Sequence, residues 1–354
     1  MRIVQMLPSL GYGDAIGNDV LALDDAMREA GYDTAIYAVN IDERLSGDRI
    51  HPVSEYVDAP STTVIYHLSI GDALNDYAAT LTARLLIIYH NITPLHFLYP
   101  EFPFPLSYAL RGRDQMRALG KKAVAAFGDS DYNRRELVDA GYTCPTEVLP
   151  ILIRFPDYEK TPSAEVMERY KNDTAVKVNF TGRMSPNKCI HDVMAAFAYY
   201  QKAVNEDSRL FLVGFHTETR PYYPALKRYE EQLGARNILF SGHIPFDQIL
   251  AYYRSSDVFV CLSEHEGFCV PLVEAMYFGI PIIAYDCAAV GETLGDGGLL
   301  LQDKSPAVVG EAINLVMTDD ALRQTLIEKG RERLKYFDNA RIKAQFLGYL
   351  KKYL

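Results

Sequence analysis

The sequence contains no hydrophobic run of the roughly 18 residues that a membrane-spanning helix needs. Its first residues, Met1–Pro8, include too short an apolar run for a secretory signal peptide, and we expect them to form a buried strand instead. The five cysteines are scattered and include no C-x-x-C pair, which argues against a disulfide framework and a structural zinc site. We therefore expect the protein in the reducing cytoplasm.

The sequence also has fewer basic than acidic residues, 36 lysines and arginines against 46 aspartates and glutamates. The formal net charge is −10 at pH 7, so the broad basic surface of a nucleic-acid-binding protein is not expected, although one small basic pocket for a diphosphate is compatible with it. The composition itself is that of a globular protein, 49% hydrophobic and 23% charged. The length of 354 residues predicts two domains, each with its own core.

Short apolar runs alternate with helix-length amphipathic segments along the whole chain. This pattern predicts the α/β class, with parallel sheets covered by helices on both faces. Gly31 and Gly141 follow two predicted helices, where a left-handed helix cap is expected. The predicted strands are Ile3–Leu7, Thr34–Val39, Thr63–His67, Arg84–Tyr89, Ala123–Phe127 and Thr146–Leu149 in the first half, and Val176–Thr181, Arg209–Val213, Ile238–Ser241, Val258–Cys261, Ile282–Ala284 and Gly298–Leu301 in the second.

An irregular stretch after Pro150 separates the two halves, and the strand–helix pattern restarts beyond it. We predict a first domain at residues 1–153, a second at 154–335, and a helix at 336–354 that packs back on the first domain. Two doubly wound domains in tandem would face a central cleft. Ligands of such folds bind outside the carboxyl ends of the strands.

The segment Ser263–Met276 is the strongest candidate site, because it joins a predicted strand to a helix whose first turn suits Pro271. Backbone N–H groups at a helix start attract a diphosphate. Glu266 would lie in the loop and Glu274 one turn inside the helix, at depths that suit two different hydroxylated rings. Gly267 permits close backbone approach. On physical grounds alone, a strand–loop–helix joint with solvated glutamates explains these residues equally well.

A second motif, Phe180–Lys188, ends the first strand of the second half. Arg183 offers a planar fork and Lys188 a point charge, a pair that suits a diphosphate whose charge grows as it leaves. The alternative for this motif taken alone is an exposed loop with two basic residues.

Residues 263–284 resemble the donor signature of retaining GT-B glycosyltransferases, above all glycosyltransferase family four (glycosyl transferases group 1). Two glutamates eight positions apart flank a Gly-Phe-x-x-Pro core in that family. The resemblance implies that Glu266 contacts the donor sugar and Glu274 the ribose. It also implies that the helix start faces the sugar and the diphosphate through the backbone around Gly267, Phe268, Cys269 and Val270.

The same resemblance extends to other parts of the chain. It implies diphosphate contacts from Gly182, Arg183 and Lys188, and it implies base contacts from the backbone of His243 and Ile244, although the His243 side chain could equally be a solvated turn residue. It also implies a GT-B fold of two Rossmann-like domains, with the acceptor on the first domain and the nucleotide sugar on the second.

A glycine-rich loop at residues 11–17 precedes the first long helix. Taken alone it is a weak match to a dinucleotide-binding fingerprint and would favour a nicotinamide oxidoreductase. We set this aside because Pro8–Leu10 are expected to separate the strand from the loop, and because the second strand is not followed directly by an acid at Asn40–Asp42. The resemblance instead places Gly13 and Asp14 near the diphosphate or the acceptor.

His90 follows a predicted strand, at the carboxyl end where ligands bind. The family commonly has a histidine here that reaches the donor sugar, so we select His90 as a catalytic candidate; a structural or capping histidine is the alternative, and His67 is a weaker candidate. Asp129–Asp131 matches the Asp-x-Asp metal motif of a different glycosyltransferase fold, but serine and aspartate are preferred helix N-caps. We therefore expect a structural turn there, and neither a metal nor a cofactor.

The sequence thus predicts a retaining, metal-independent glycosyltransferase. It would move a hexose from a nucleotide sugar, UDP-glucose by family frequency, to a saccharide or lipid-linked acceptor in polysaccharide or glycoconjugate synthesis. Aromatic and basic residues at 101–122 predict peripheral contact with the inner face of the plasma membrane, or equally a helix packed on the first domain. A nucleotide-sugar epimerase and a non-catalytic sugar-nucleotide binding protein on the same fold are the alternatives.

Overall fold

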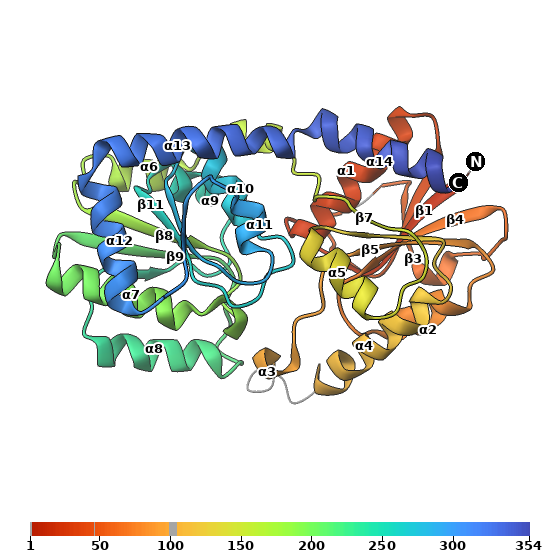
Figure 1. Ribbon diagram of the computed structural model, residues 1–354, viewed down its shortest axis with the longest axis horizontal. Helices are drawn as coiled ribbons and strands as arrows, with labels where there is room; N and C mark the ends of the chain where they lie inside the picture. The colour runs from red at the N-terminus through yellow and green to blue at the C-terminus, as the bar shows by residue number, and fades with distance from the viewer. Residues whose placement is uncertain (1, 46, 99–104) are drawn as a thin grey trace. The chain divides into compact units, whose positions relative to one another are not determined.

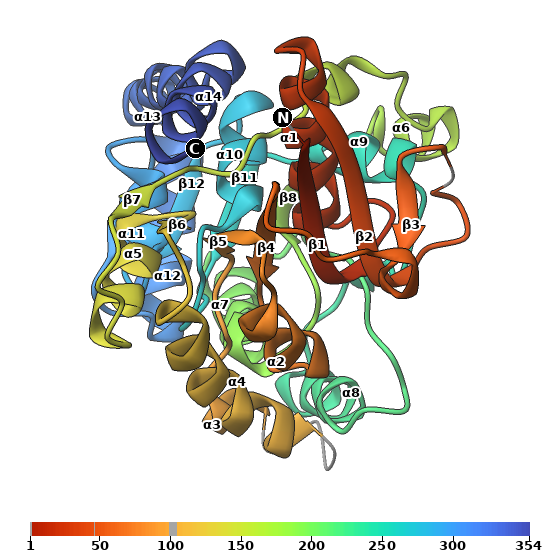
Figure 2. The same ribbon diagram turned by 90° about the vertical axis from the view of Figure 1, so that its right-hand side faces the viewer.

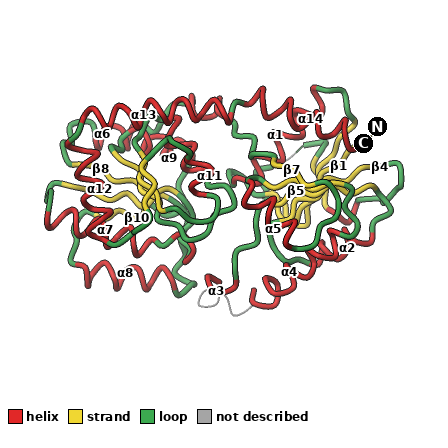
Figure 3. Tube along the Cα trace, viewed as in Figure 1, coloured by secondary structure: helices red, strands yellow, loops and turns green. Residues whose placement is uncertain are grey.

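The computed structural model describes residues 2–45, 47–98 and 105–354, with the side chains of 105–109 left aside. It divides the chain into two compact units. Unit 1 comprises Met1–Leu95, Phe104–Arg154 and Phe337–Leu354, and unit 2 comprises His96–Pro103 and Phe155–Tyr336. Each unit has a parallel sheet of its own with helices around it (Figure 3).

The sheet of unit 1 has the strand order β3-β2-β1-β4-β5-β6-β7, and all its strands pair in parallel (Figure 2). Its central strands are almost entirely apolar, which is why they are buried on both faces. The strands are β1 (Arg2–Leu10), β2 (Asp33–Ile41), β3 (Ile50–Pro52), β4 (Thr62–Leu68), β5 (Arg84–Tyr89), β6 (Ala125–Gly128) and β7 (Thr146–Val148).

The helices of unit 1 include the C-terminal helix α14, which lies beside α1 (Figure 1). The ring of Tyr349 on α14 stacks on Phe127 with 5.2 Å between centroids, and its hydroxyl donates to the carbonyl of Val148. The helices are α1 (Ala15–Glu29), α2 (Ala73–Thr80), α4 (Pro105–Gly120), α5 (Asp131–Asp139) and α14 (Asn339–Tyr353), with the short 3-10 helix η1 (Val53–Glu55).

Unit 2 is a second doubly wound sheet, with the order β10-β9-β8-β11-β12-β13. Its strands are β8 (Val176–Thr181), β9 (Ser208–Val213), β10 (Ile238–Phe240), β11 (Val258–Cys261), β12 (Ile282–Tyr285) and β13 (Leu299–Leu301). Its helices are α6 (Ala164–Tyr170), α7 (Ile190–Ala203), α8 (Tyr222–Leu233), α9 (Phe246–Arg254), α10 (Val270–Tyr277), α11 (Val290–Leu294), α12 (Pro306–Thr318) and α13 (Asp320–Leu334), with η2 (Phe155–Glu159), η3 (Pro186–Lys188) and most of η4 (Lys335–Phe337) and α3 (Leu95–Leu98).

The predicted strands are all present, and Gly31 and Gly141 have the predicted left-handed conformation, with φ of +84° and +89°. The edge strand β3 was missed, because three residues that include a proline show no alternation to detect.

Several strand ends differ from the prediction by one to three residues, and two of these differences bear on the glycine-rich loop. Strand β1 continues past Pro8 to Leu10, because the ladder resumes at Ser9 after the residue that has no N–H. Strand β2 likewise runs on to Ile41 and is followed directly by Asp42. Both structural reasons given for setting aside a dinucleotide site are therefore wrong, and the function of the loop at 11–17 has to be judged on other grounds.

No helix among the described residues is long and apolar enough to cross a bilayer. Of the segment predicted to touch a membrane surface, residues 101–104 lie outside the described residues. Farther along it, the arginines of α4 face acidic partners: Arg111 pairs with Asp76, and Arg113 with Glu136 at 3.2 Å.

Helix α14 is expected to be essential for the stability of unit 1, because Phe346 is fully buried. Replacing Phe346 with alanine should lower the free energy of unfolding by about 3–5 kcal/mol, the cost of a large core cavity. Urea unfolding followed by circular dichroism measures the loss. The exposed Lys351→Ala on the same helix is the control and should change stability by no more than about 0.5 kcal/mol. A loss at Phe346 as small as that of the control would contradict this role.

Candidate active site

The loop between β11 and α10 packs inward rather than into solvent. Ser263 is fully buried, and Glu266 is only 7% exposed, which decides against the alternative of solvated glutamates for that residue. The hydroxyl of Thr293 donates to the carbonyl of Phe268 and anchors the end of the loop. Cys269 precedes α10 with φ of +77°, a conformation that costs energy for a residue with a side chain and that gathers at functional sites.

An ion pair joins the two motifs that were found separately in the sequence. Lys188 Nζ lies 2.5 Å from the Glu266 carboxylate, across 78 residues of chain, and the Ser263 hydroxyl donates to the same carboxylate at 2.8 Å. Burial opposes the charge on Lys188, but the attraction of Glu266 outweighs it and raises the Lys188 pKa. A second contact joins the same two loops: the Asn187 side-chain amide donates to the backbone carbonyl of His265 at 3.0 Å.

Glu274 lies on α10 with both carboxylate oxygens engaged by phenols. The Tyr158 hydroxyl donates to one oxygen at 2.9 Å, and the Tyr253 hydroxyl to the other at 2.6 Å. Burial raises the Glu274 pKa, and the two hydroxyls offset part of this rise. Sequence reasoning missed both tyrosines: Tyr158 lies in the segment predicted as a linker, and Tyr253 occupies an ordinary core position of α9.

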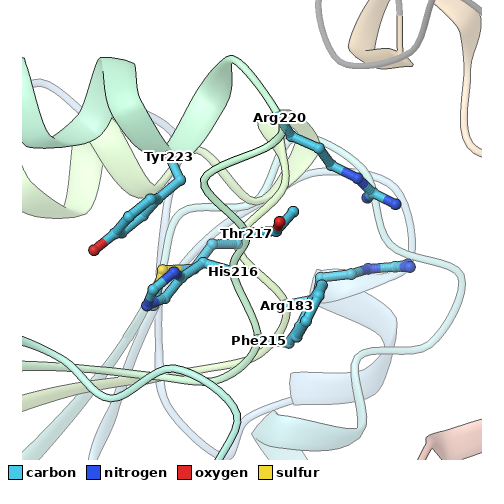
Figure 4. Close-up of a pocket in the computed structure, with 7 residues that line it drawn as sticks. Arg183, Phe215, His216, Thr217, Arg220 and Tyr223 are labelled. Carbon is cyan, nitrogen blue, oxygen red and sulfur yellow. The ribbon is translucent and has the colours of Figure 1, made fainter.

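Arg183 lines a small surface pocket beyond β8 and β9. Its side chain and that of Arg220 extend in the same direction, while His216 stacks on Tyr223 with 3.8 Å between centroids (Figure 4). Arg220 was missed, since no motif surrounds it. The residues that line the pocket are Arg183, Met184, Phe215, His216, Thr217, Arg220 and Tyr223.

Glycine is needed where the strand-end loops of unit 2 meet. A β-carbon on Gly214 would lie 2.1 Å from the Gly182 carbonyl oxygen, so only glycine permits this approach. Gly214 also bridges to Gly242, directly before the predicted base-contacting residues. There His243 is exposed and Ile244 half-buried.

In unit 1 the glycine-rich loop ends at Asp14, which caps α1. Its carboxylate accepts the Gly17 N–H at 2.6 Å, and Gly13 before it has φ of +77°. The structure therefore gives Asp14 a helix-capping contact. The ligand contact predicted for it remains an expectation.

His90 is held on both sides. Its side chain is 1% exposed; Nδ1 lies 2.9 Å from the Asp129 carboxylate and Nε2 lies 2.8 Å from His67 Nδ1. A ring nitrogen of His90 could reach a sugar only if one of these contacts broke. The predicted helix cap at residues 129–131 is confirmed for Ser130, which accepts the Asn133 N–H, but the pairing of Asp129 with His90 was not foreseen.

Known proteins resemble this chain in sequence and in fold. Residues 165–333 match the family model of the glycosyl transferases group 1. The O-antigen chain mannosyltransferase B of Escherichia coli is 25% identical over 277 residues, which cover 74% of this chain and 69% of that protein. The next two curated relatives are covered over only 48% and 33% of their own lengths.

Solved structures resemble the whole chain. Sucrose-phosphate synthase from Thermosynechococcus elongatus superposes with a TM-score of 0.77 at 18% identity, covering 99% of this chain and 98% of that one. Anabaena Alr3699/HepE in complex with UDP-glucose has a TM-score of 0.74 at 18% identity, covering 99% and 100%. The chain thus has the GT-B fold of glycosyltransferases. The match to the glycosyl transferases group 1 family model is confined to residues 165–333, just under half of the chain.

The partly buried carboxyl of Glu274 should destabilise the folded protein relative to the uncharged amide of glutamine. A carboxyl whose pKa is raised on folding loses stability as pH rises from its unfolded value of about 4.3 to its folded value. Glu274→Gln can keep both tyrosine contacts, so it should be more stable than the wild type by about 1 kcal/mol at pH 8, with a smaller difference at pH 4. Urea unfolding at the two pH values measures this.

The exposed Glu168→Gln serves as the control for that comparison, and its effect should be the same at both pH values. If Glu274→Gln proved less stable than the wild type at pH 8, the carboxylate would be stabilising unit 2 instead.

Proposed function

We propose that the protein is a retaining glycosyltransferase that transfers a hexose from a nucleotide sugar to a saccharide or lipid-linked acceptor. One observation carries the proposal: Lys188 and Glu266 are paired, and their loops also hold Arg183 and the start of α10 at the same edge of the unit 2 sheet. Cations beside a helix N-terminus suit a diphosphate leaving group. The match of residues 165–333 to the glycosyl transferases group 1 model supports the same function.

The roles of the residues follow from their chemistry. Arg183 and Lys188 neutralise the charge that develops on the departing nucleoside diphosphate. Glu266, held by Lys188 and Ser263, orients the hydroxyls of the donor sugar, and Glu274 those of the ribose. The amides of Phe268, Cys269 and Val270 face the diphosphate; the backbone of His243 and Ile244 meets the base.

The transfer proceeds on one face of the sugar. The bond from the anomeric carbon to the diphosphate oxygen breaks, and the acceptor oxygen bonds to the same face while its proton passes to the leaving phosphate. This route needs no covalent sugar–enzyme intermediate, and the Glu266 carboxylate is already engaged by a lysine and a serine. An NMR time course of the product should show a retained anomeric configuration.

We propose UDP-glucose as the donor, bound by unit 2, and unit 1 as the acceptor side. The solved HepE complex with UDP-glucose supports this donor, whereas a mannosyltransferase stands among the sequence relatives. Thermal shift against a panel of nucleotide sugars tests the choice, because a ligand that binds only the folded state raises the melting temperature. Binding without turnover or donor hydrolysis would instead favour a sugar-nucleotide binding protein.

Removal of either positively charged side chain that is predicted to bind the diphosphate should destabilise the transition state. Arg183→Ala and Lys188→Ala should each lower kcat about 10²–10³-fold, the usual loss for one group that stabilises developing charge. Release of the nucleoside diphosphate measures the rate. Arg236→Ala, an arginine largely exposed beside Glu206, is the matched control and should retain the wild-type rate. Unchanged turnover in both site variants would refute the assignment.

Charge neutralisation by Arg183 and Lys188 also predicts that catalysis does not depend on a divalent cation. Excess EDTA should leave the initial rate unchanged, and added Mg²⁺ or Mn²⁺ should not restore or increase it. A rate that EDTA abolishes and Mn²⁺ restores would contradict this part of the proposal.

A further inference from the structure

A continuous chain of hydrogen bonds crosses the interior of unit 1, from the carboxyl ends of β4, β5 and β6 to the middle of β1. It runs from Asp129 to His90 at 2.9 Å, from His90 to His67 at 2.8 Å, and from His67 to Gln5 at 2.9 Å. The side chains of all these residues are buried. His67 and Gln5 belong to neither of the sequence motifs and have no part in the proposed reaction.

The two ends of the chain can only accept hydrogen bonds. The Gln5 amide nitrogen donates to the Val20 carbonyl at 2.8 Å, so the Gln5 oxygen faces His67. An ionised Asp129 has no hydrogen to donate. His67 therefore donates from Nε2, its Nδ1 is an acceptor, and His90 must donate from Nε2 to His67.

Counting hydrogens then shows that the chain holds one extra proton. The contacts Asp129–His90, His90–His67 and His67–Gln5 need three hydrogens, whereas two neutral imidazoles carry one N–H each. Burial raises the Asp129 pKa, although His90 lowers it again through its charge and its hydrogen bond. Since an ordinary histidine (about 6.5) has a higher pKa than an ordinary aspartate (about 3.9), we assign the third proton to His90 rather than to Asp129.

The ring geometry favours a proton over a metal ion between the histidines. The rings of His67 and His90 are parallel to within 6°, and their centroids are 5.1 Å apart. This centroid distance is close to the largest possible for two imidazoles whose nitrogens are 2.8 Å apart. The N···N contact therefore lies nearly on the line that joins the two ring centres. A zinc ion about 2.0–2.1 Å from each nitrogen would lie off this line, where the lone pairs do not point.

We propose that His67 and Asp129 are positioning residues that hold His90 as a buried imidazolium, with its ring locked between them. His67 supplies the acceptor for one N–H, and Asp129 supplies the counter-charge for the other. Gln5 selects the tautomer of His67 that makes this possible. The extra proton is therefore part of the folded structure of unit 1.

The charges around His90 agree with this assignment. Burial disfavours a charged ring, but Asp129, and then Asp19 and Asp14 on the side of α1, outweigh it and raise the His90 pKa. Burial and the charge on His90 together place the His67 pKa well below its ordinary value, so the pair binds one extra proton and not two. Burial raises the pKa of Asp19 to about 7.

One consequence rests on the proposed function. Asp14 caps α1, and Asp19 on that helix lies within 4.8 Å of a ring nitrogen of His90, so the imidazolium lies within electrostatic range of the loop at 11–17. If that loop meets the donor diphosphate, a fixed positive charge behind it favours the departing anion. Activity should then fall as pH rises through the folded pKa of His90.

The test is histidine ¹⁵N NMR of the full-length protein between pH 6 and 9. At pH 7 one buried histidine should show two protonated ring nitrogens, and a second should be neutral with its proton on Nε2. Two neutral histidines at pH 7, or co-purified zinc bound to both rings, would overturn the proposal. This measurement needs no substrate, so its result is independent of whether the protein is a glycosyltransferase.

Three variants assign the signals and test the positioning role. Asp129→Asn can donate to His90 Nδ1, so the chain needs no extra proton, and the His90 pKa should fall by about 1–3 units. His67→Gln preserves an acceptor and a donor and should retain the imidazolium, whereas His67→Leu should lose it. His51→Gln, at the edge strand β3, is the control and should leave the signals unchanged.

In the pH profile of kcat, the fall in activity at high pH should begin at lower pH in Asp129→Asn and His67→Leu. In His67→Gln it should begin at the same pH as in the wild type. If all three variants lost activity equally at every pH, the two residues would have only a structural role and the positioning proposal would fail.

Discussion

The candidate site depends above all on the largely buried ion pair between Lys188 and Glu266. Strands β8 and β11 are neighbours in a parallel sheet, so the loops that follow them meet at one edge. Taking either charge out of water alone would cost several kcal/mol, and the two charges therefore hold their loops together. The position of Arg183 on one loop and the start of α10 after the other follow from this pairing.

In unit 1, hydrogen bonds rather than an ion pair hold the polar side chains in place. The polar side chains at its strand ends are buried and joined into one chain, so that His90 is fixed without any exposed partner. Asp129 Oδ1 has no hydrogen-bond partner among the described residues, but each of the three contacts along the chain is made. Buried polar groups joined in this way rigidify a core and leave few alternative arrangements. Both units thus place constrained polar residues at the carboxyl edge of a parallel sheet, the position where ligands of doubly wound folds bind.

Much of the fold could be predicted from sequence because parallel strands buried on both faces are nearly continuous apolar runs. The errors have local causes. Strand β1 continues through Pro8 because one missing N–H removes a single ladder bond from an otherwise buried strand. Strand β3 has only three residues, too few for an alternation of apolar and polar residues to be detected. Neither error changes the order of the strands or the residues at the candidate site.

The sequence by itself determined the class of the fold and the residue types at the candidate site, because strand periodicity and the two donor-side motifs are local patterns. Only the tertiary structure decided the partners of these residues. Tyr158 and Tyr253 reach Glu274 from two separate elements, and His67 reaches His90 from the neighbouring strand. Such contacts leave no trace in sequence spacing, since strand order and side-chain packing, rather than distance along the chain, bring the groups together.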